Sequence, residues 1–201
     1  PEPLVLYAPT WRDGDVDPGV PTALEAASIH KLMESVGARL VLRPHPLGAG
    51  PYAEVTGERV HLLGAEKVRD ITPLLGAFDA IITDYSSIAV DFSLLARPIV
   101  WFAPDLEHYV RTRGLYEPLE VTSAGRLQRD WPGTLGRVAE VIEPGSWARR
   151  AAEADARALA KRFHAHPEGG AAERVVAEIV RLGQPARERI PTGAVFFESY
   201  Y

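Results

Sequence analysis

Short apolar runs alternate with helix-like segments through the first half of the chain, and this alternation restricts the fold more than any other feature. Such a pattern is typical of a parallel sheet whose strands are joined by crossover helices. The expected strands are Leu4–Ala8, Arg39–Leu42, Val60–Leu63, Ala80–Thr83 and Ile99–Phe102. We expect the sheet to end at the last of them. The sequence therefore predicts an α/β fold with one parallel sheet.

Helical patterns separate these strands and then fill the second half of the chain. Thr22 can cap the first helix, which ends at Gly37. Further helices are expected over residues 71–78, 87–95, 132–143, 146–163 and 170–182. Residues 184–191 are polar and bounded by proline, and 194–201 are apolar and aromatic. We expect one lobe over 1–183, with a linker and tail over 184–201.

Charge and composition narrow the classes of function. The chain has 22 Lys and Arg against 27 Asp and Glu, a net charge of −5, so no general attraction to nucleic acid follows. Cysteine is absent, which excludes disulfides, thiolate metal sites and a cysteine nucleophile. No apolar run reaches the roughly 18 residues that a membrane-spanning helix needs. A site for an anion must therefore be local.

Polar residues follow the predicted strands, at the edge where open α/β sheets bind ligands. Asp84, Ser86 and Ser87 lie between the strand 80–83 and the next helix. Hydroxyls, first-turn amides and the helix dipole together favour a diphosphate at this point. The alternative is that Asp84 or Ser86 only caps the helix.

A histidine follows the strand 39–42. His45 stands between Pro44 and Pro46, which stiffen the backbone and present the imidazole for proton transfer or phosphate contact. Arg43 lies beside it and adds a positive charge. The alternative is an ordinary solvated loop histidine.

Arginines supply the remaining basic candidates. Arg12 follows the first strand and has the planar donor geometry that suits phosphate, although a surface ion pair with Asp13 or Asp15 is the alternative. Arg111 and Arg113 follow the strand 99–102 at a greater distance. All three are expected to lie near the strand ends.

Signatures of metal sites and nucleotide loops are weak or missing. His164 and His166 lack a third ligand nearby, and Asp13, Asp15 and Asp17 lack the glycine and glutamate spacing of a calcium loop. Neither a GxGxxG nor a Walker sequence occurs. Without these loops, the sequence gives no support for dinucleotide oxidoreduction or P-loop hydrolysis. We expect no metal and no cofactor.

A series of short motifs runs through the chain. They are VLYAPTWR at 5–12, RPHP at 43–46, ITDYSS at 82–87 with DF at 91–92, PI at 98–99, DLEHY at 105–109, RGLY at 113–116 and GGAAERV at 169–175. In this order they resemble the CDP-glycerol glycerophosphotransferase family, whose members build teichoic-acid and capsule polymers. The resemblance covers about residues 4–182.

The resemblance implies a fold. Family members resemble glycosyltransferases with two facing lobes, so this chain should be a Rossmann-like parallel sheet with flanking helices, like the C-terminal half of a GT-B fold, plus C-terminal helices. The chain begins with Pro rather than Met, and we expect a fragment that lacks the N-terminal acceptor lobe with its histidine base. Glu168 replaces the family's usual aspartate and alters the reach of that carboxylate. Residues 195–200 resemble the opening strand of such a lobe, so the tail is either the start of a following module or an extraneous segment.

The resemblance also implies roles for the candidate residues. His45 is the expected catalytic residue, as a donor to phosphate or to the leaving CMP, and Asp84 would organise its loop. The residues expected to bind the pyrophosphate side of the substrate are Arg12, Arg43, Asp84, Ser86, Ser87, Arg111 and Arg113.

The implied reaction is transfer of glycerol phosphate from CDP-glycerol, or a related CDP-alcohol, to a growing polymer with release of CMP. The implied partners are that nucleotide and a lipid-linked acceptor, with no nucleic acid. The implied location is cytoplasmic, peripheral at the inner face of the plasma membrane, and the fragment alone is expected to be inactive. Alternatives are a sugar-nucleotide glycosyltransferase or epimerase lobe, and a non-catalytic module that binds nucleotide or polymer.

Overall fold

The computed structural model describes residues 2–12, 17–45 and 50–188. The chain divides into two compact units, Pro1–Phe163 and His164–Tyr201, and each is considered by itself. No helix in the described ranges is both long enough and apolar enough to cross a bilayer.

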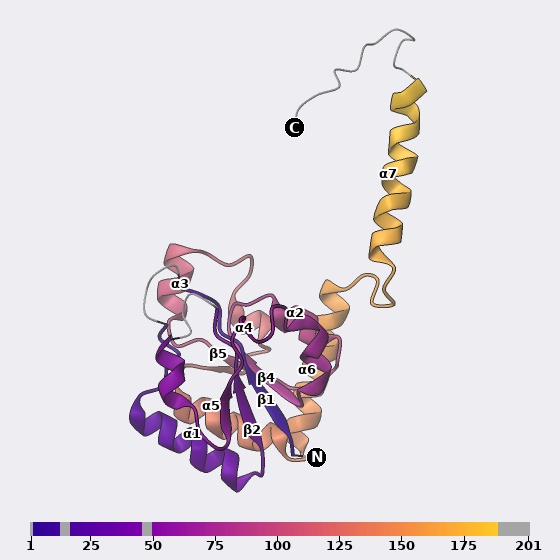
Figure 1. Ribbon diagram of the computed structural model, residues 1–201. Coiled ribbons are helices and arrows are strands. Elements are labelled where there is room, and N and C mark those ends of the chain that lie inside the picture. The colour runs from indigo at the N-terminus through magenta and orange to yellow at the C-terminus, as the bar shows by residue number, and fades with distance from the viewer. Residues whose placement is uncertain (1, 13–16, 46–49, 189–201) are drawn as a thin grey trace. The chain divides into compact units, whose positions relative to one another are not determined.

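The first unit is built on a parallel sheet of six strands (Figure 1). The strands are β1 (Leu4–Tyr7), β2 (Arg39–Leu42), β3 (Val60–Leu62), β4 (Ala80–Thr83), β5 (Ile99–Phe102) and β6 (Leu127–Gln128). Their order is β3-β2-β1-β4-β5-β6. The chain moves outward from β1 to β3 and then returns to β4 on the other side of β1. The carboxyl ends of the adjacent strands β1 and β4 thus mark the switch point, where ligands of such sheets bind.

Helices cover both faces of this sheet (Figure 1). The α-helices are α1 (Ala23–Ser35), α2 (Ile88–Ser93), α3 (Leu106–Thr112), α4 (Leu119–Thr122), α5 (Trp131–Ile142) and α6 (Trp147–Phe163), and the 3₁₀ helices are η2 (Gly50–Val55) and η3 (Thr72–Ala77). Tyr7 packs with Ile29 of α1 and Val138 of α5, whereas Leu6 packs with Phe92 of α2 on the other face. Successive side chains of a strand thus enter the hydrophobic cores on opposite faces of the sheet. Burial of each large apolar side chain contributes about 1.5–3 kcal/mol to the stability of the fold.

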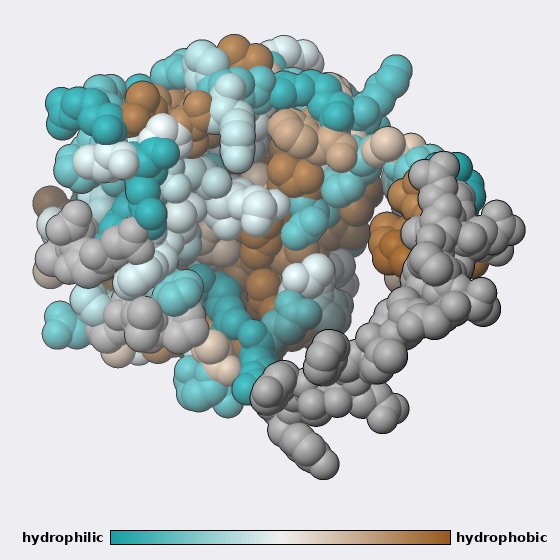
Figure 2. Space-filling model, turned by 90° about the horizontal axis from the view of Figure 1, so that it is seen from above, coloured by the Kyte–Doolittle hydropathy of each residue, from teal (hydrophilic) through white to brown (hydrophobic). Residues whose placement is uncertain are grey.

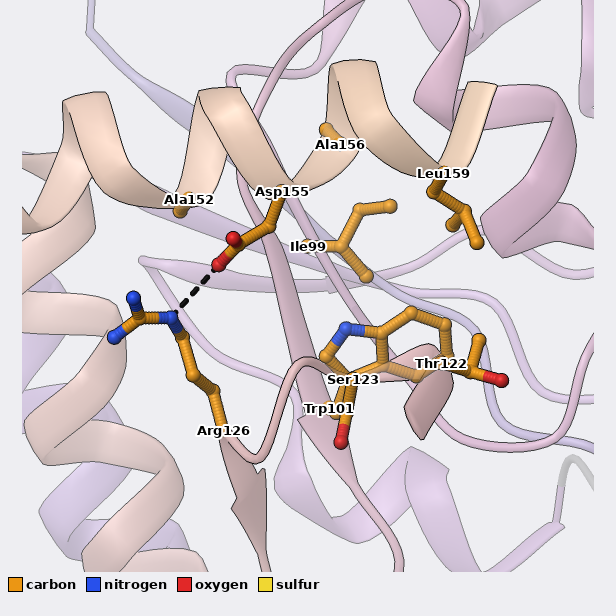
Figure 3. Close-up of a pocket in the computed structure, with 9 residues that line it drawn as sticks. All are labelled: Ile99, Trp101, Thr122, Ser123, Arg126, Ala152, Asp155, Ala156 and Leu159. Atoms are coloured by element: carbon orange, nitrogen blue, oxygen red, sulfur yellow. Dashed lines mark hydrogen bonds and ion pairs between the residues drawn. The ribbon is translucent and has the colours of Figure 1, made fainter. Parts of the chain in front are cut away.

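Helix α6 closes the sheet beside β5 (Figure 3). Its Ala156 and Leu159 lie over Ile99, and Arg126, just before β6, donates to Asp155 at 2.7 Å. The cavity among these side chains is about 10 Å³, which is room for about one water. The face of the sheet over β5 is therefore packed closely against α6.

Most strands have the bounds expected from sequence. The segments Arg39–Leu42, Ala80–Thr83 and Ile99–Phe102 are confirmed, and the first and third strands end one residue early, at Tyr7 and Leu62. The first helix has the expected Thr22 cap, and Gly37 follows it with a φ of 63°. The parallel α/β fold is therefore confirmed.

Other expectations are corrected. The sheet does not end at β5, because β6 adds a sixth strand through the pairing of Trp101 with Leu127. Two residues are too few to show a recognisable alternation. Helices α3 and α4 lie in a segment where the pattern indicated none, and α2 is six residues long rather than nine, with Ala96 beyond it in a left-handed conformation. The segment 71–78 forms the 3₁₀ helix η3, which contains Pro73 and Gly76.

The second unit contains helix α7 (Ala171–Glu188). Val175, Val176, Ile179 and Val180 are all more than half exposed. The helix extends past Leu182, where we expected it to end, into the predicted linker. The apolar tail 194–201 lies outside the described residues. The boundary at residue 183 stays a prediction.

Thr22→Ala should destabilise the first unit by about 1 kcal/mol, because the threonine and Glu25 form a reciprocal capping box at the start of α1. Urea unfolding followed by circular dichroism measures this loss. Ser28→Ala is the matched control, since its exposed hydroxyl only bonds the Leu24 carbonyl within the helix. Equal effects of the two substitutions would contradict the capping role.

Candidate functional site

Four neighbouring strands deliver their exit loops to one edge of the sheet. Because β2, β1, β4 and β5 are parallel and adjacent, residues that follow them are brought to the same end. Figure 2 views the molecule from above Figure 1, the end toward which these strands run, and shows hydrophilic and near-neutral residues with hydrophobic patches among them. The strand-exit residues named from sequence therefore share one edge.

Arg12 lies at the centre of these loops and is buried, with 8% of its surface exposed. Its Nη2 donates to Asp84 at 2.8 Å, and its Nε and Nη2 donate to the two oxygens of Asp105 at 2.8 and 3.0 Å. Its Nη1 donates to the Thr10 carbonyl. A buried guanidinium needs such compensation, and two carboxylates supply it here.

Asp84 joins the exits of β1 and β4 across the switch point. Its Oδ1 accepts from the backbone amide and hydroxyl of Thr10 at 2.9 and 2.6 Å, while its Oδ2 accepts from Arg12. The carboxylate is 2% exposed. Its hydrogen bonds go to the β1 loop, so this carboxylate organises the two loops and does not act as a helix cap.

Asp105 and two tyrosines complete the surroundings of the guanidinium. Tyr85 and Tyr109 stack with ring centroids 3.8 Å apart, and the Arg12 carbon Cζ lies 5.1 and 5.3 Å from the two centroids. The Tyr85 hydroxyl donates to Asp105 at 3.2 Å. Asp105 and Tyr85 belong to the DLEHY and ITDYSS motifs but were not among the candidate site residues, and only their position after a strand could have indicated them.

His45 leaves β2 next to this cluster and is exposed. Its imidazole stacks on the indole of Trp11, with centroids 5.1 Å apart and planes 25° apart. Trp11 lies between Thr10 and Arg12, so the histidine is joined to the loop that Asp84 holds. His45 is therefore on the same edge as the serines.

The paired serines follow Asp84 directly. Ser86 Oγ accepts only a long bond, 3.4 Å, from the Ile88 amide, and Ser87 makes no side-chain cap. Both side chains are partly exposed. Their hydroxyls are thus available to a ligand, although the six-residue α2 offers a smaller dipole than the nine-residue helix expected from sequence.

The remaining candidate arginines come from other segments of the chain, and the charge of Arg113 acts on Tyr109, which packs on Arg12. Arg43 donates to the carbonyls of Leu63 and Arg69 at 3.0 and 3.3 Å, beyond β3. Arg111 and Arg113 are exposed at the end of α3. Arg111 lines an open groove of about 590 Å³, and Tyr109 is the residue of this helix that packs on Arg12. Phosphate contact by these three arginines stays a prediction.

A buried polar network lies under the β1 loop. Asp17 accepts from the Tyr52 hydroxyl at 2.6 Å and from the Gly19 amide at 2.8 Å, and Trp131 donates to the Gly19 carbonyl at 3.1 Å. Burial raises the pKa of Asp17, although the Tyr52 hydrogen bond opposes this. These hydrogen bonds restrain the chain around Asp17 and Gly19, and the Tyr52 hydroxyl links them to Tyr7 of β1.

Within the described ranges, no three His, Asp or Glu side chains are grouped to hold a metal. His166 contacts Glu168 at 3.1 Å, and Glu168 lies 3.7 Å from Arg174. Asp13 and Asp15 fall outside the described residues.

Opposing effects set the protonation of the cluster. Burial lowers the pKa of Arg12, but hydrogen bonds and charge from Asp105 and Asp84 outweigh it and hold that pKa above its usual value. Burial raises the pKa of Asp105, but the hydrogen bond and charge of Arg12, together with the hydrogen bond from Tyr85, outweigh it, so the net pKa of Asp105 is lowered. Both groups are charged at neutral pH.

Asp105→Asn should cost about 2 kcal/mol of unfolding free energy at pH 7, because a buried guanidinium loses a charged partner. The pKa of Asp105 is lower in the folded state, so its stabilisation is present above the unfolded pKa and disappears as pH falls through the folded pKa. The deficit of the variant should therefore shrink below about pH 4.

Urea unfolding of both proteins between pH 7 and pH 3 measures this difference. Asp17 titrates with the opposite sign in both proteins, so its effect cancels. Glu107→Gln, which removes a carboxylate 74% exposed in its ion pair with Arg129, is the control and should change little. A deficit that stays constant over the whole range would refute the role of the Asp105 charge.

Curated proteins with similar sequences come from teichoic acid synthesis. The chain is 32% identical over 132 residues to the teichoic acid ribitol-phosphate primase of Bacillus spizizenii (strain W23), covering 65% of this chain and 33% of that protein. It is 31% identical over 159 residues to the teichoic acid poly(glycerol phosphate) polymerase of Bacillus subtilis (strain 168), covering 70% and 19%. The chain thus spans a third or less of the length of these relatives.

Solved structures share the fold. The wall teichoic acid polymerase TagF superposes with a TM-score of 0.64 at 21% identity, over 92% of this chain and 45% of that chain. UDP-GlcNAc 2-epimerase from Neisseria meningitidis, bound to UDP-GlcNAc, superposes with a TM-score of 0.56 at 17% identity, over 90% and 45%. These likenesses support the Rossmann-like, GT-B-type architecture.

The family model that describes CDP-Glycerol:Poly(glycerophosphate) glycerophosphotransferase matches residues 2–181. This range contains the four strand exits, the Arg12 cluster and both serines. The chain therefore belongs to the CDP-glycerol:poly(glycerophosphate) glycerophosphotransferase family.

Proposed function

We propose that this chain is the nucleotide-binding lobe of a transferase that takes glycerol phosphate, or a related alditol phosphate, from a CDP-alcohol and adds it to a teichoic-acid or capsule-like polymer. Membership of the family supports the reaction class. A relative named for ribitol phosphate and one named for glycerol phosphate are equally similar, at 32% and 31% identity. The proposal is therefore a CDP-alcohol as a class.

The observation that carries this proposal is the linked set of loops at the switch point. Thr10, Arg12 and Asp84 hold the exits of β1 and β4 together, and the serine hydroxyls follow immediately. His45 joins the same edge from β2 through Trp11. Such an arrangement offers neutral donors and one imidazole to a diphosphate without a basic surface. A TagF structure soaked with CDPG superposes on this chain with a TM-score of 0.67 and supports the choice of ligand.

In the proposed reaction, the terminal hydroxyl of the polymer attacks the phosphorus that bears the alcohol. A new P–O bond forms, the bond to the CMP oxygen breaks, and the hydroxyl proton passes to a base. Ser86, Ser87 and His45 would donate to phosphoryl oxygens, where charge shifts from one phosphate to the other. His45 would act as a donor to the leaving CMP, because the base belongs on the acceptor side of the reaction.

The buried arginine has a different task in this scheme. Arg12 is enclosed by Asp84 and Asp105, so it would hold the loops in register while the serines contact the ligand. Arg43, Arg111 and Arg113 remain proposed phosphate contacts at the rim. A second lobe would supply a lipid-linked acceptor, which would place the protein at the inner face of the plasma membrane.

A sugar-nucleotide function is the second candidate. The superposition on an epimerase bound to UDP-GlcNAc favours it, because the two proteins share the same architecture. Nucleotide preference separates the two candidates: a CDP-alcohol transferase should select cytidine, and an epimerase should select uridine.

Titration calorimetry should detect binding of CMP and CDP-glycerol to the 201-residue chain and weaker or no binding of UDP and UDP-GlcNAc. His45→Ala and the double variant Ser86→Ala, Ser87→Ala should each weaken CMP roughly 10- to 100-fold, because each removes charge-assisted hydrogen bonds to phosphate.

His61→Ala and Ser28→Ala are the matched controls, since these exposed residues lie on β3 and α1 and should leave affinity unchanged. Unchanged affinity in both site variants would remove the site assignment. Preference for UDP-GlcNAc over CDP-glycerol would replace the proposed function with the sugar-nucleotide alternative.

A further inference from the structure

Two aromatic rings from neighbouring strand exits lie face to face beside the serine loop. Trp11 follows β1 and His45 follows β2, and their ring centroids are 5.1 Å apart with planes inclined by 25°. This is offset stacking, which favours a defined mutual orientation of the two rings.

The indole is carried on a rigid segment. Thr10, the residue before Trp11, donates both its amide and its hydroxyl to Asp84. Arg12, the residue after it, is bound to Asp84 and Asp105. Hydrogen bonds of both neighbouring residues, part-buried at Thr10 and largely enclosed at Arg12, therefore restrain the tryptophan segment.

The imidazole lies at the surface. His45 is exposed, while Pro44 before it is buried, so the backbone is anchored but burial does not select a side-chain rotamer. The indole face supplies a surface against which the ring can rest. Ordering of the imidazole before the ligand arrives would reduce the entropy lost on binding.

We propose that Trp11 is a positioning residue that holds the His45 imidazole in the orientation needed to donate to a phosphate group. This inference rests on the proposed function, because it assigns the stack a purpose in phosphate binding. The restrained segment from Thr10 to Arg12 would thus restrict, through the Trp11 ring, the orientation of His45 after the neighbouring strand.

Nuclear magnetic resonance of the ligand-free 201-residue chain tests the stack directly. The indole ring current should shift the His45 ring-proton resonances upfield, with assignment by His45→Ala. Trp11→Leu should move these resonances toward their position in an unstructured peptide, and Trp11→Phe should restore part of the shift. Trp147→Leu removes an indole 69% exposed at the start of α6 and should leave them unchanged. An unaltered His45 resonance in Trp11→Leu would overturn the inference.

Calorimetry with CMP then tests the consequence for binding. Trp11→Leu should weaken CMP about fivefold, and Trp11→Phe should stay within about twofold of the parent chain. In the His45→Ala background, Trp11→Leu should produce no further loss, because the imidazole it positions is already gone.

The two experiments separate the possible failures. Equal losses from Trp11→Leu with and without His45 would overturn the positioning role and leave the proposed function intact. Parent chain that binds neither CMP nor CDP-glycerol would overturn the proposed function and the positioning role together. A thermal melt on each variant verifies that the chain is folded in these measurements.

Discussion

The structure at the functional edge depends on one buried cation. Arg12 is enclosed between Asp84 and Asp105, which come from the exits of β4 and β5, while Arg12 itself follows β1. A guanidinium removed from water is tolerated only with such partners, because an uncompensated buried charge is strongly destabilising. The same ion pairs that compensate its burial therefore fix three loops relative to one another. The loops need no other covalent or metal link to keep a defined shape.

The parallel topology decides which loops this cation can join. The strand order places β1 and β4 side by side and sends the intervening chain away through β2 and β3. Residues 72 positions apart thus meet at the switch point, as in the Arg12–Asp84 bond. Local sequence could indicate this edge because each strand is a short apolar run followed by polar residues. The parallel strands of the core and the positions of the candidate residues on one edge were predictable for that reason.

The orientation of the side chains was not predictable in the same way. Arg12 was expected to face a phosphate, yet its donors are directed to two carboxylates, and Arg43 donates to backbone carbonyls beyond β3. Both outcomes depend on tertiary neighbours that a single sequence does not identify. Strand β6 was missed because two residues carry no periodicity, and its position depends on the backbone pairing with β5. Local patterns therefore determined the elements, while packing determined which groups are left for a ligand.

The net charge of −5 is compatible with an anionic ligand for this reason. Arg12 at the centre of the site is buried, so it holds the loops together and is not a surface charge. The carboxylates of Asp84 and Asp105 balance its positive charge. In the proposed function, donors to a diphosphate would come from neutral hydroxyls, backbone amides and one imidazole, whose hydrogen bonds strengthen where water is excluded. Such a site gains affinity from geometry more than from charge, so its selectivity depends on how rigidly the loops are held. The hydrogen bonds of Thr10, Arg12 and Asp84 are the source of that rigidity.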